Sequence, residues 1–380
     1  MKLPDHIPDE AVLDEMLSRP TPDVNDFIKE LEGDIMILGA AGKIGVSLAR
    51  MAARAVRETG VRKKVIAVDL FDDELRERMP RSSAARVSEH NKNKQLIDDS
   101  SQPGCEESQS VREDLDQAGV ETIRCNLLNR SEVSRLPRAG NVIYMAGKKF
   151  GTESDQELTW AINVLAPDYV ADHFSRSGIV VYSTGCVYPL VSPDQGGCRE
   201  DTPPRPVGEY AQSCLGRERV FSYYSKTFGT RICLYRLNYS IDLRYGVLHD
   251  IGMKVYHCEP VELAVSHFNC IWQGDANRLA LLCLGHCATP PAILNITGPE
   301  TISVKETAQK FARYFNKEVE FKDEQVNTNM YLSDASKSTG IFGSPSVPLD
   351  KMIQWQARWI EQGSRSLNKP THFEVTSGQY

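Results

Sequence analysis

The stretch "DIMILGAAGKIGVSLARMAARAV", residues 34–56, places an apolar run, a set of glycines and a helical pattern in immediate succession. The run 35–38 is apolar throughout, which is typical of a strand buried on both faces of a sheet. Glycines follow at positions 39, 42 and 45, and "VSLARMAARAV" then has apolar residues at helical spacing. This order predicts a strand that leads through a tight turn directly into a helix.

Five further apolar runs repeat this rhythm, and helical stretches separate most of them. They lie at residues 64–71, 120–128, 141–147, 178–188 and 230–239. Apolar strands that alternate with helices predict an α/β fold, in which helices cover both faces of a mostly parallel sheet.

The patterns divide the chain into three parts. Residues 1–32 hold two short amphipathic segments and are expected to form a helical arm packed on the main domain. Residues 33–240 carry the sheet, and residues 241–380 are mainly a smaller, less regular lobe and a tail. Within the main domain, residues 80–115 are polar and poor in large apolar side chains, which predicts a long surface insertion.

Composition argues against several classes of protein. The formal net charge is -7 and no block of Lys and Arg offsets it, so no nucleic-acid partner is expected. No apolar run approaches the ~20 residues that cross a bilayer, and the N-terminus lacks the apolar core of a secretion signal. The ten cysteines follow no disulfide spacing, which favours a reducing, cytoplasmic location. The cluster "CLGHC" at 283–287 is interpreted as part of a buried helix, and no metal is expected.

The glycine spacing predicts a dinucleotide site. Gly39 would allow the tight turn, Gly42 would let the backbone approach a pyrophosphate, and Gly45 would permit close packing of helix and strand. The N–H groups of the following helix would bind the phosphates. Asp69 ends the second strand, where a carboxylate accepts hydrogen bonds from ribose hydroxyls and repels a 2′-phosphate, so NAD is favoured over NADP.

The glycine spacing, "STGCVY" at 183–188 and the Tyr210 helix "GEYAQSCLGRERVF" at 208–221 together resemble the extended short-chain dehydrogenase/reductase family of NAD-dependent epimerases and dehydratases. The resemblance runs from about residue 33 to 360. It implies a Rossmann-type doubly wound sheet with a C-terminal substrate lobe and a possible homodimer. It also implies an enzyme that transfers a hydride at a secondary alcohol of a carbohydrate-like substrate, such as a sugar, sugar acid or sugar nucleotide.

The resemblance also implies roles for individual residues. Tyr210 matches the catalytic tyrosine, Thr184 the hydroxyl that orients the substrate, and Asn238 a substrate contact. The residues expected to bind the cofactor are Gly39, Gly42, Lys43, Ile44, Gly45, Asp69, Asn126, Leu127, Ala146, Gly147, Asn163 and Tyr210.

Two positions depart from the family pattern. Cys214 stands four residues after Tyr210, where the family has a lysine that lowers the tyrosine pKa and binds the nicotinamide ribose. Gly185 and Cys186 follow Thr184, where dehydratases usually carry an acidic pair. The second departure counts against a dehydratase and leaves an epimerase or a simple dehydrogenase.

Another positive charge could replace the missing lysine. Lys149, in "GKKFG" at 147–151, is the preferred catalytic candidate at the mouth of the site, with Lys148 beside it; the oxidised nicotinamide is itself a cation. Arg217 shares a helical face with Tyr210, but it lies two turns away, ~10 Å along the axis, which argues against direct contact. Both lysines could instead be solvated loop residues.

The remaining substrate predictions come from the C-terminal half. Arg244 could bind a carboxylate or phosphate, or form a surface ion pair. Trp272 and Gln273 could face a sugar ring, or Trp272 could be an ordinary core residue. The predicted substrate contacts are therefore Lys149, Thr184, Asn238, Arg244, Trp272 and Gln273.

A reading from a different class is also open. The missing lysine would suit an NAD-binding regulator or scaffold that has lost its catalytic residues. The retention of both Thr184 and Tyr210 beside an intact glycine loop favours the enzyme.

Overall fold

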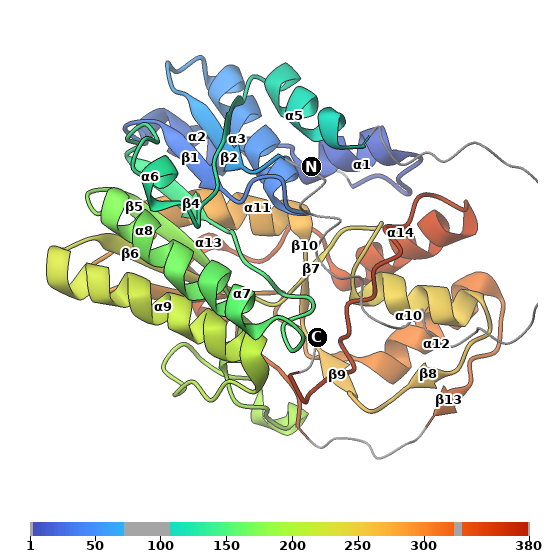
Figure 1. Ribbon diagram of the computed structural model, residues 1–380. Helices are drawn as coiled ribbons and strands as arrows, with labels where there is room; N and C mark the ends of the chain where they lie inside the picture. Colours follow the sequence, from blue (N-terminus) through green and yellow to red (C-terminus); the bar gives the residue numbers. More distant parts are fainter. Residues whose placement is uncertain (1–2, 72–106, 323–328, 379–380) are drawn as a thin grey trace, which may run out of the picture.

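The computed structural model describes residues 3–71, 107–322 and 329–378, which form a sheet domain beside a smaller lobe (Figure 1). Within these residues the main sheet has seven parallel strands in the order β11-β6-β5-β4-β1-β2-β3. The strands are β1 Ile35–Leu38, β2 Val65–Asp69, β3 Glu121–Arg124, β4 Asn141–Tyr144, β5 Gly178–Thr184, β6 Arg231–Leu237 and β11 Ala292–Ile296. The predicted doubly wound α/β sheet is confirmed.

The strand order reverses beside β1. The chain builds outward from β1 to β2 and β3, and it then returns to place β4 on the other side of β1. Ile35 pairs with Val65 on β2 and with Asn141 on β4. The carboxyl ends of β1 and β4 therefore flank the switch point, where open parallel sheets bind ligands.

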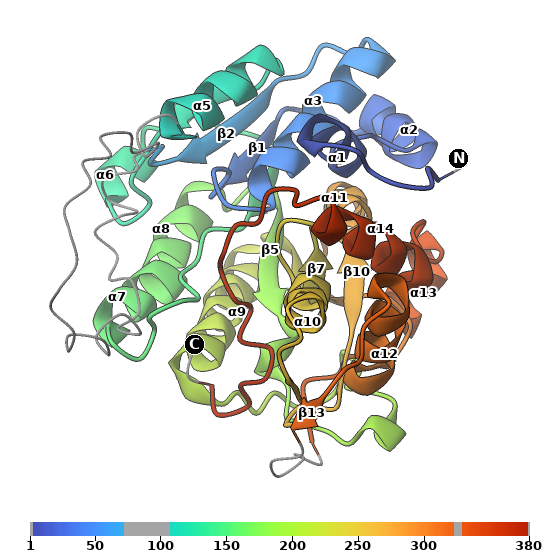
Figure 2. The ribbon, with the colours of Figure 1, turned by 90° about the vertical axis from the view of Figure 1, so that its right-hand side faces the viewer.

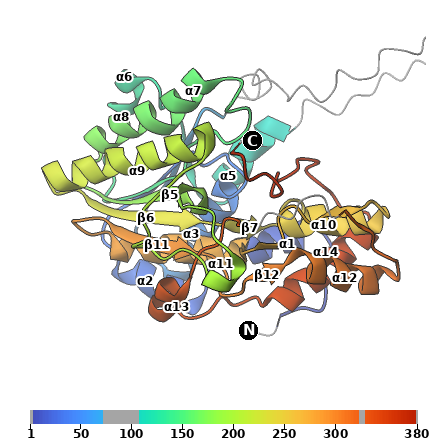
Figure 3. The same ribbon diagram turned by 90° about the horizontal axis from the view of Figure 1, so that it is seen from below.

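Two helical layers cover the sheet, as Figure 3 shows. One face packs on α2 Pro22–Glu30, α3 Gly45–Thr59, α5 Glu107–Gln117 and α11 Gln273–Leu282. The other face packs on α6 Arg130–Val133, α8 Ala166–His173 and the long α9 Gly208–Phe228. Between β4 and α8 lie α7 Gln156–Trp160 and a π-helical turn, Ala161–Leu165. Strands β1, β4 and β5 are buried along their whole length, because both faces of the sheet are covered.

The smaller lobe has its own apolar core, which includes Phe311, Trp355 and Trp359. Its helices are α10 Val247–Tyr256, α12 Val304–Phe315 and α14 Leu349–Glu361. Short strand pairs surround them: β7 Tyr239–Ile241 with β10 Cys270–Trp272, β9 His267–Phe268 with β12 Ile302–Ser303, and β8 Val261–Glu262 with β13 Phe321–Lys322. Helix α13, Ser336–Phe342, returns to the sheet domain beside β11.

Two boundaries differ from the predicted ones. Strand β11 shows that the chain re-enters the main sheet after residue 240, so the smaller lobe is not one continuous segment. Residues 80–106 of the predicted insertion lie outside the described residues. Residues 107–117 form α5, whose Leu115 is fully buried, so the last part of that stretch belongs to the packed domain.

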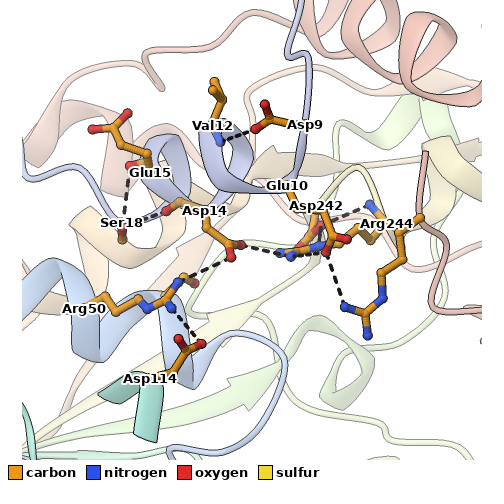
Figure 4. A network of polar contacts seen from close by, with 12 residues as sticks. Asp9, Glu10, Val12, Asp14, Glu15, Ser18, Arg50, Asp114, Asp242 and Arg244 are labelled. Atoms are coloured by element: carbon orange, nitrogen blue, oxygen red, sulfur yellow. Dashed lines mark hydrogen bonds and ion pairs between the residues drawn. The ribbon is translucent and has the colours of Figure 1, made fainter. Parts of the chain in front are cut away.

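The N-terminal arm connects the two lobes. Helix α2 packs on α3, and α1, Glu10–Leu17, contacts α3 and α11. Asp14 on α1 is paired with Arg50 of the sheet domain at 3.3 Å and with Arg244 of the smaller lobe at 2.9 Å (Figure 4). None of the described helices combines the length and the apolarity that crossing a membrane requires.

Candidate active site

A cavity of about 340 Å³ opens at the carboxyl ends of β1, β4, β5 and β6. The loops after these strands form one wall, helix α9 contributes a second, and the smaller lobe closes the third. The predicted residues that line it are Gly39, Gly42, Lys43, Ile44, Gly147, Lys149, Thr184, Tyr210, Asn238 and Gln273. The fold thus brings together residues that are spread over more than two hundred positions.

The glycine loop is shaped as a cradle. Gly39 has φ +88°, and a Cβ there would lie 2.6 Å from the backbone nitrogen of Ala146 on the neighbouring chain segment. A Cβ on Gly45 would lie 2.3 Å from the Ala40 carbonyl oxygen, so this glycine is needed for close packing at the start of α3. At Gly42 the nearest atom would be 3.5 Å away, which leaves this part of the loop open.

Asp69 lies beside the loop at the end of β2. Its carboxylate accepts hydrogen bonds from the backbone N–H groups of Ala41 at 2.9 Å and Leu70 at 2.7 Å. These contacts fix an acid next to the cradle on the β2 side. The glycine loop, the N-terminus of α3 and the Asp69 carboxylate together fit a dinucleotide that lies across the switch point.

Tyr210 and Thr184 both line the cavity, and the Thr184 hydroxyl lies near enough to influence the pKa of Tyr210. Burial raises the pKa of Tyr210 well above its ordinary value, and the Cys214 and Cys186 thiols raise it further, whereas Arg217 and the Thr184 hydroxyl lower it. Burial also raises the pKa of Cys214 to about 11. Cys214 is therefore a protonated, buried thiol at neutral pH, so it places no anion beside the tyrosine.

The two candidate lysines lie in different surroundings. The Lys148 ammonium is buried and bonds to the Gly151 carbonyl at 3.1 Å and the Asp155 carboxylate at 3.2 Å, so it supports the loop. Lys149 lines the cavity, as Lys148 does, and burial lowers the pKa of Lys149. The preference for Lys149 over Lys148 and its catalytic role both stay predictions.

Arg217 also lines the cavity, although its spacing from Tyr210 argued against direct contact with that residue. Its guanidinium donates to the Tyr182 carbonyl at 2.9 Å and to Asn163 Oδ1 at 2.7 Å. Side chains on a helix lean towards its N-terminus, so a long arginine reaches back towards Tyr210. The length of the arginine side chain and its tilt along the helix could have predicted from the sequence that Arg217 lines the cavity.

Six predicted cofactor residues do not line the cavity: Gly45 and Asp69, described above, and Asn126, Leu127, Ala146 and Asn163. Asn163 is fully buried and bonded through both ends of its amide, to the Lys148 backbone, Ser213 and Arg217. Ala146 contacts the Gly39 turn. Asn126 and Leu127 follow β3, beside β2 and Asp69, and the Asn126 side chain accepts from the Leu128 N–H at 3.0 Å.

The substrate predictions divide in a similar way. Asn238 and Gln273 line the cavity, and Asn238 Oδ1 is buried with no hydrogen-bond partner among the described residues. Trp272 does not line it: its ring is 3% exposed and packs edge-on to Trp355 in the core of the smaller lobe. The aromatic-platform prediction for Trp272 is therefore not supported.

Arg244 is likewise absent from the cavity wall, so its prediction as a substrate contact is not supported either. Its guanidinium bonds bidentately to Asp242 and pairs with Glu10 and Asp14 of the N-terminal arm (Figure 4). These carboxylates already satisfy its charge.

Sequence reasoning missed the part of the wall made by the C-terminal strap, residues 364–378. Figure 2 shows this strap running from α14 across the molecule towards α9. Thr371 lines the cavity, and its N–H and hydroxyl donate to the Asp250 carboxylate at 2.8 and 2.5 Å. The polar sequence of the tail contains no pattern that would predict that Thr371 lines the cavity.

Residues 35–239 match the model of the NAD-dependent epimerase/dehydratase family. The chain belongs to this family. The predicted recognition is confirmed, and NAD is confirmed as the cofactor of the family. No curated protein matches the chain in sequence.

Solved structures of similar fold include sugar-nucleotide epimerases. A UDP-glucuronic acid 4-epimerase from Bacillus cereus, in complex with UDP-glucuronic acid and NAD, is 18% identical with a TM-score of 0.65 over 87% of this chain and 99% of the other. A UDP-glucose 4-epimerase from Thermus thermophilus, in complex with NAD, is 17% identical with a TM-score of 0.61 over 86% and 99%. At this identity the likeness establishes the epimerase/dehydratase fold.

Proposed function

We propose that this protein is an NAD-dependent epimerase or dehydrogenase that acts on a secondary alcohol of a carbohydrate-like substrate, with sugar nucleotides as the first candidates. The observation that carries the proposal is that Tyr210 and Thr184 line the same cavity as the glycine loop. Family membership supports it, as does the likeness to enzymes solved with UDP-glucuronic acid or UDP-glucose.

The side chains would divide the work between them. Tyr210, as phenolate, would take the hydroxyl proton of the substrate, and Thr184 would hold the same oxygen by a hydrogen bond. Bound NAD would accept the hydride from the carbon and, in an epimerase, return it to the opposite face. The residues placed to hold NAD are the cradle Gly39–Gly42, Lys43 and Asp69. Asn238, whose buried oxygen has no partner among the described residues, would bind a substrate hydroxyl.

The absence of the family lysine at position 214 favours a competing function. Burial and two thiols disfavour the Tyr210 phenolate, which is what an NAD-binding regulator with a decayed site would show. The cations Lys149 and Arg217 on the cavity wall favour the enzyme instead, because each would stabilise a phenolate.

We further propose that the protein works in the cytoplasm as a homodimer. Tyr223 and Phe228 on α9 are each 59% exposed, and Trp160 and Leu165, in segments that contact α9, are also exposed. Large apolar side chains gathered in this way favour a partner. Sedimentation equilibrium should give twice the chain mass, and that value should fall when Tyr223 and Phe228 are both changed to Ser.

The activity is tested by incubating the protein with NAD and a panel of UDP-sugars, sugar acids and free sugars. Product isomers are followed by NMR, and net reduction by nicotinamide absorbance. Tyr210→Phe should lower turnover by about 10²–10⁴-fold, the usual contribution of an acid/base group. Tyr223→Phe, on the exposed side of the same helix, is the matched control and should leave turnover unchanged. Turnover that survives Tyr210→Phe would refute the assignment.

A further inference from the structure

Arg217 is a buried cation without a buried anion. The residue is 5% exposed, and within the described part of the chain its guanidinium bonds to two neutral oxygens, the Tyr182 carbonyl and Asn163 Oδ1. Among the described residues no carboxylate lies within ion-pairing distance of it, and its Nε–H has no hydrogen-bond partner. A buried charge is costly unless paired, so this arrangement points to a ligand that takes up the remaining donors.

A second buried arginine, Arg236, has different surroundings. Glu218 and Arg236 form a buried, bidentate pair on the same side of the sheet, at 2.8 and 2.7 Å. The fold therefore neutralises a buried arginine where no ligand is needed. At Arg217, which faces the cavity, it supplies no such anion from the described residues.

The strand order places Arg217 on one particular half of a bound dinucleotide. Asp69 on β2 marks the adenosine side of the glycine loop, so the other half extends across the ends of β4 and β5. Gly147 follows β4, and a Cβ there would lie 2.4 Å from Arg217 Nη2. The absence of that side chain leaves the guanidinium beside the cavity where the second ribose would lie.

We propose that Arg217 binds the hydroxyls of the nicotinamide-side ribose, doing from the third turn of α9 what Cys214 cannot do from the second. The inference rests on the NAD site of the proposed function. Asn163 and the Tyr182 carbonyl then act as positioning groups, because they hold two of the guanidinium nitrogens and aim the remaining donors. This explains why Asn163 is buried and fully bonded behind the cavity wall.

A structural clamp is the alternative, since Arg217 also links α9 to β5 and to the π-helical turn. The two roles predict different effects of an Arg217 substitution on ligand binding. A clamp would affect every ligand of the cradle alike, whereas a ribose contact affects only ligands that carry the second ribose.

The test compares equilibrium binding of NAD, ADP-ribose and ADP to the whole protein by calorimetry, since ADP ends before the second ribose. Arg217→Met should weaken NAD and ADP-ribose by about 10–100-fold, the value of hydrogen bonds from a charged donor, and leave ADP within twofold. Arg217→Gln, which can keep one bond to Asn163 or Tyr182, should show the same selective loss if the Met variant does not fold. Arg217→Lys should restore part of the selectivity, and Arg219→Met, an exposed arginine on α9, is the control.

Equal weakening of all three ligands, or no weakening of NAD, would overturn the inference, as would a wild-type protein that prefers ADP over NAD. The readout is independent of turnover. Selective loss in a protein that converts no sugar would uphold the role of Arg217 while the proposed activity fails.

Discussion

Lys43 lies in the glycine loop with its ammonium 3.1 Å from the centre of the Tyr245 ring. Burial, together with the charges of Lys369 and Lys149, lowers its pKa to about 7, although Asp250 and Asp242 act in the opposite direction. Between pH 7 and 10 the ligand-free site therefore holds fewer protons than free lysine would. A pyrophosphate beside Lys43 would favour the ammonium and raise that pKa again.

NAD binding at pH 8 should accordingly take up close to one proton. Calorimetry in two buffers with different ionisation enthalpies measures this uptake directly. Lys43→Met should abolish most of it and weaken NAD binding. Equal uptake in that variant would assign the proton to another group, with Lys149 and Lys369 as the neighbours to examine.

Individual site residues were predictable where a motif fixes the local backbone. Gly39 and Gly45 are required by close contacts that any strand–turn–helix unit of this kind makes, and Tyr210 follows from its helix. The surroundings of Arg244 and Trp272 were not predictable, because the side chains that contact them stand far away in the sequence. The carboxylate of Glu10 that contacts Arg244 stands 234 positions earlier in the chain.

Helix α9 and strand β6 are joined by a buried ion pair between Glu218 and Arg236, each with a side chain 3% exposed. Ser183 Oγ donates to the same carboxylate at 2.6 Å. The pair holds the helix that carries Tyr210 against β6, and the Ser183 bond joins the same helix to the end of β5 that carries Thr184. Its removal would leave a charged guanidinium in the core.

Glu218→Gln should lower the free energy of unfolding by about 3–5 kcal/mol, the cost of breaking a buried pair from one side. Urea denaturation measures it. Asp172→Asn, which breaks the exposed pair with Arg130, should cost less than about 1 kcal/mol. A loss at Glu218 no larger than that at Asp172 would show that the pair does not anchor α9.

At this scale the strands of the main sheet could be predicted from apolar runs, because a sheet covered on both faces buries every residue of its central strands. Strand β11, "AILNI", has the same character. The sequence pattern places β11 in the smaller lobe. Its pairing with β6 depends on the three-dimensional path of the chain, which a local pattern does not contain.

Two terminal segments connect the lobes of the molecule, and one of them, the C-terminal strap, lines the cavity through Thr371. The N-terminal arm joins the lobes through Asp14, and the C-terminal strap crosses from α14 to the start of α9. The strap is held by Thr371 on Asp250, by Glu374 on Lys254 at 3.1 Å and by the buried Phe373. Gly208 and Gly378 pass so closely that a Cβ on Gly208 would lie 2.5 Å from the Gly378 carbonyl oxygen.

Deletion of residues 364–380 should leave the sheet domain folded but open one wall of the cavity. We expect the dissociation rate constant of a bound sugar nucleotide to rise several-fold, measured by stopped-flow, because a closing segment retains ligand. Thr371→Val, which removes only one hydrogen bond to Asp250, should give a smaller change in the same direction. An unchanged rate constant in the deletion variant would mean that the strap is not a gate.

The central claim is that this cavity performs oxidation without the lysine of its family. Its most direct test is the absorbance of the NAD-loaded protein at the reduced-nicotinamide band in the milliseconds to seconds after a substrate from the panel is added. The account predicts a rise in the wild type that is absent in Tyr210→Phe and retained in Tyr223→Phe. Tight NAD binding with no rise for any substrate, the same in all three proteins, would contradict it and favour a binding protein.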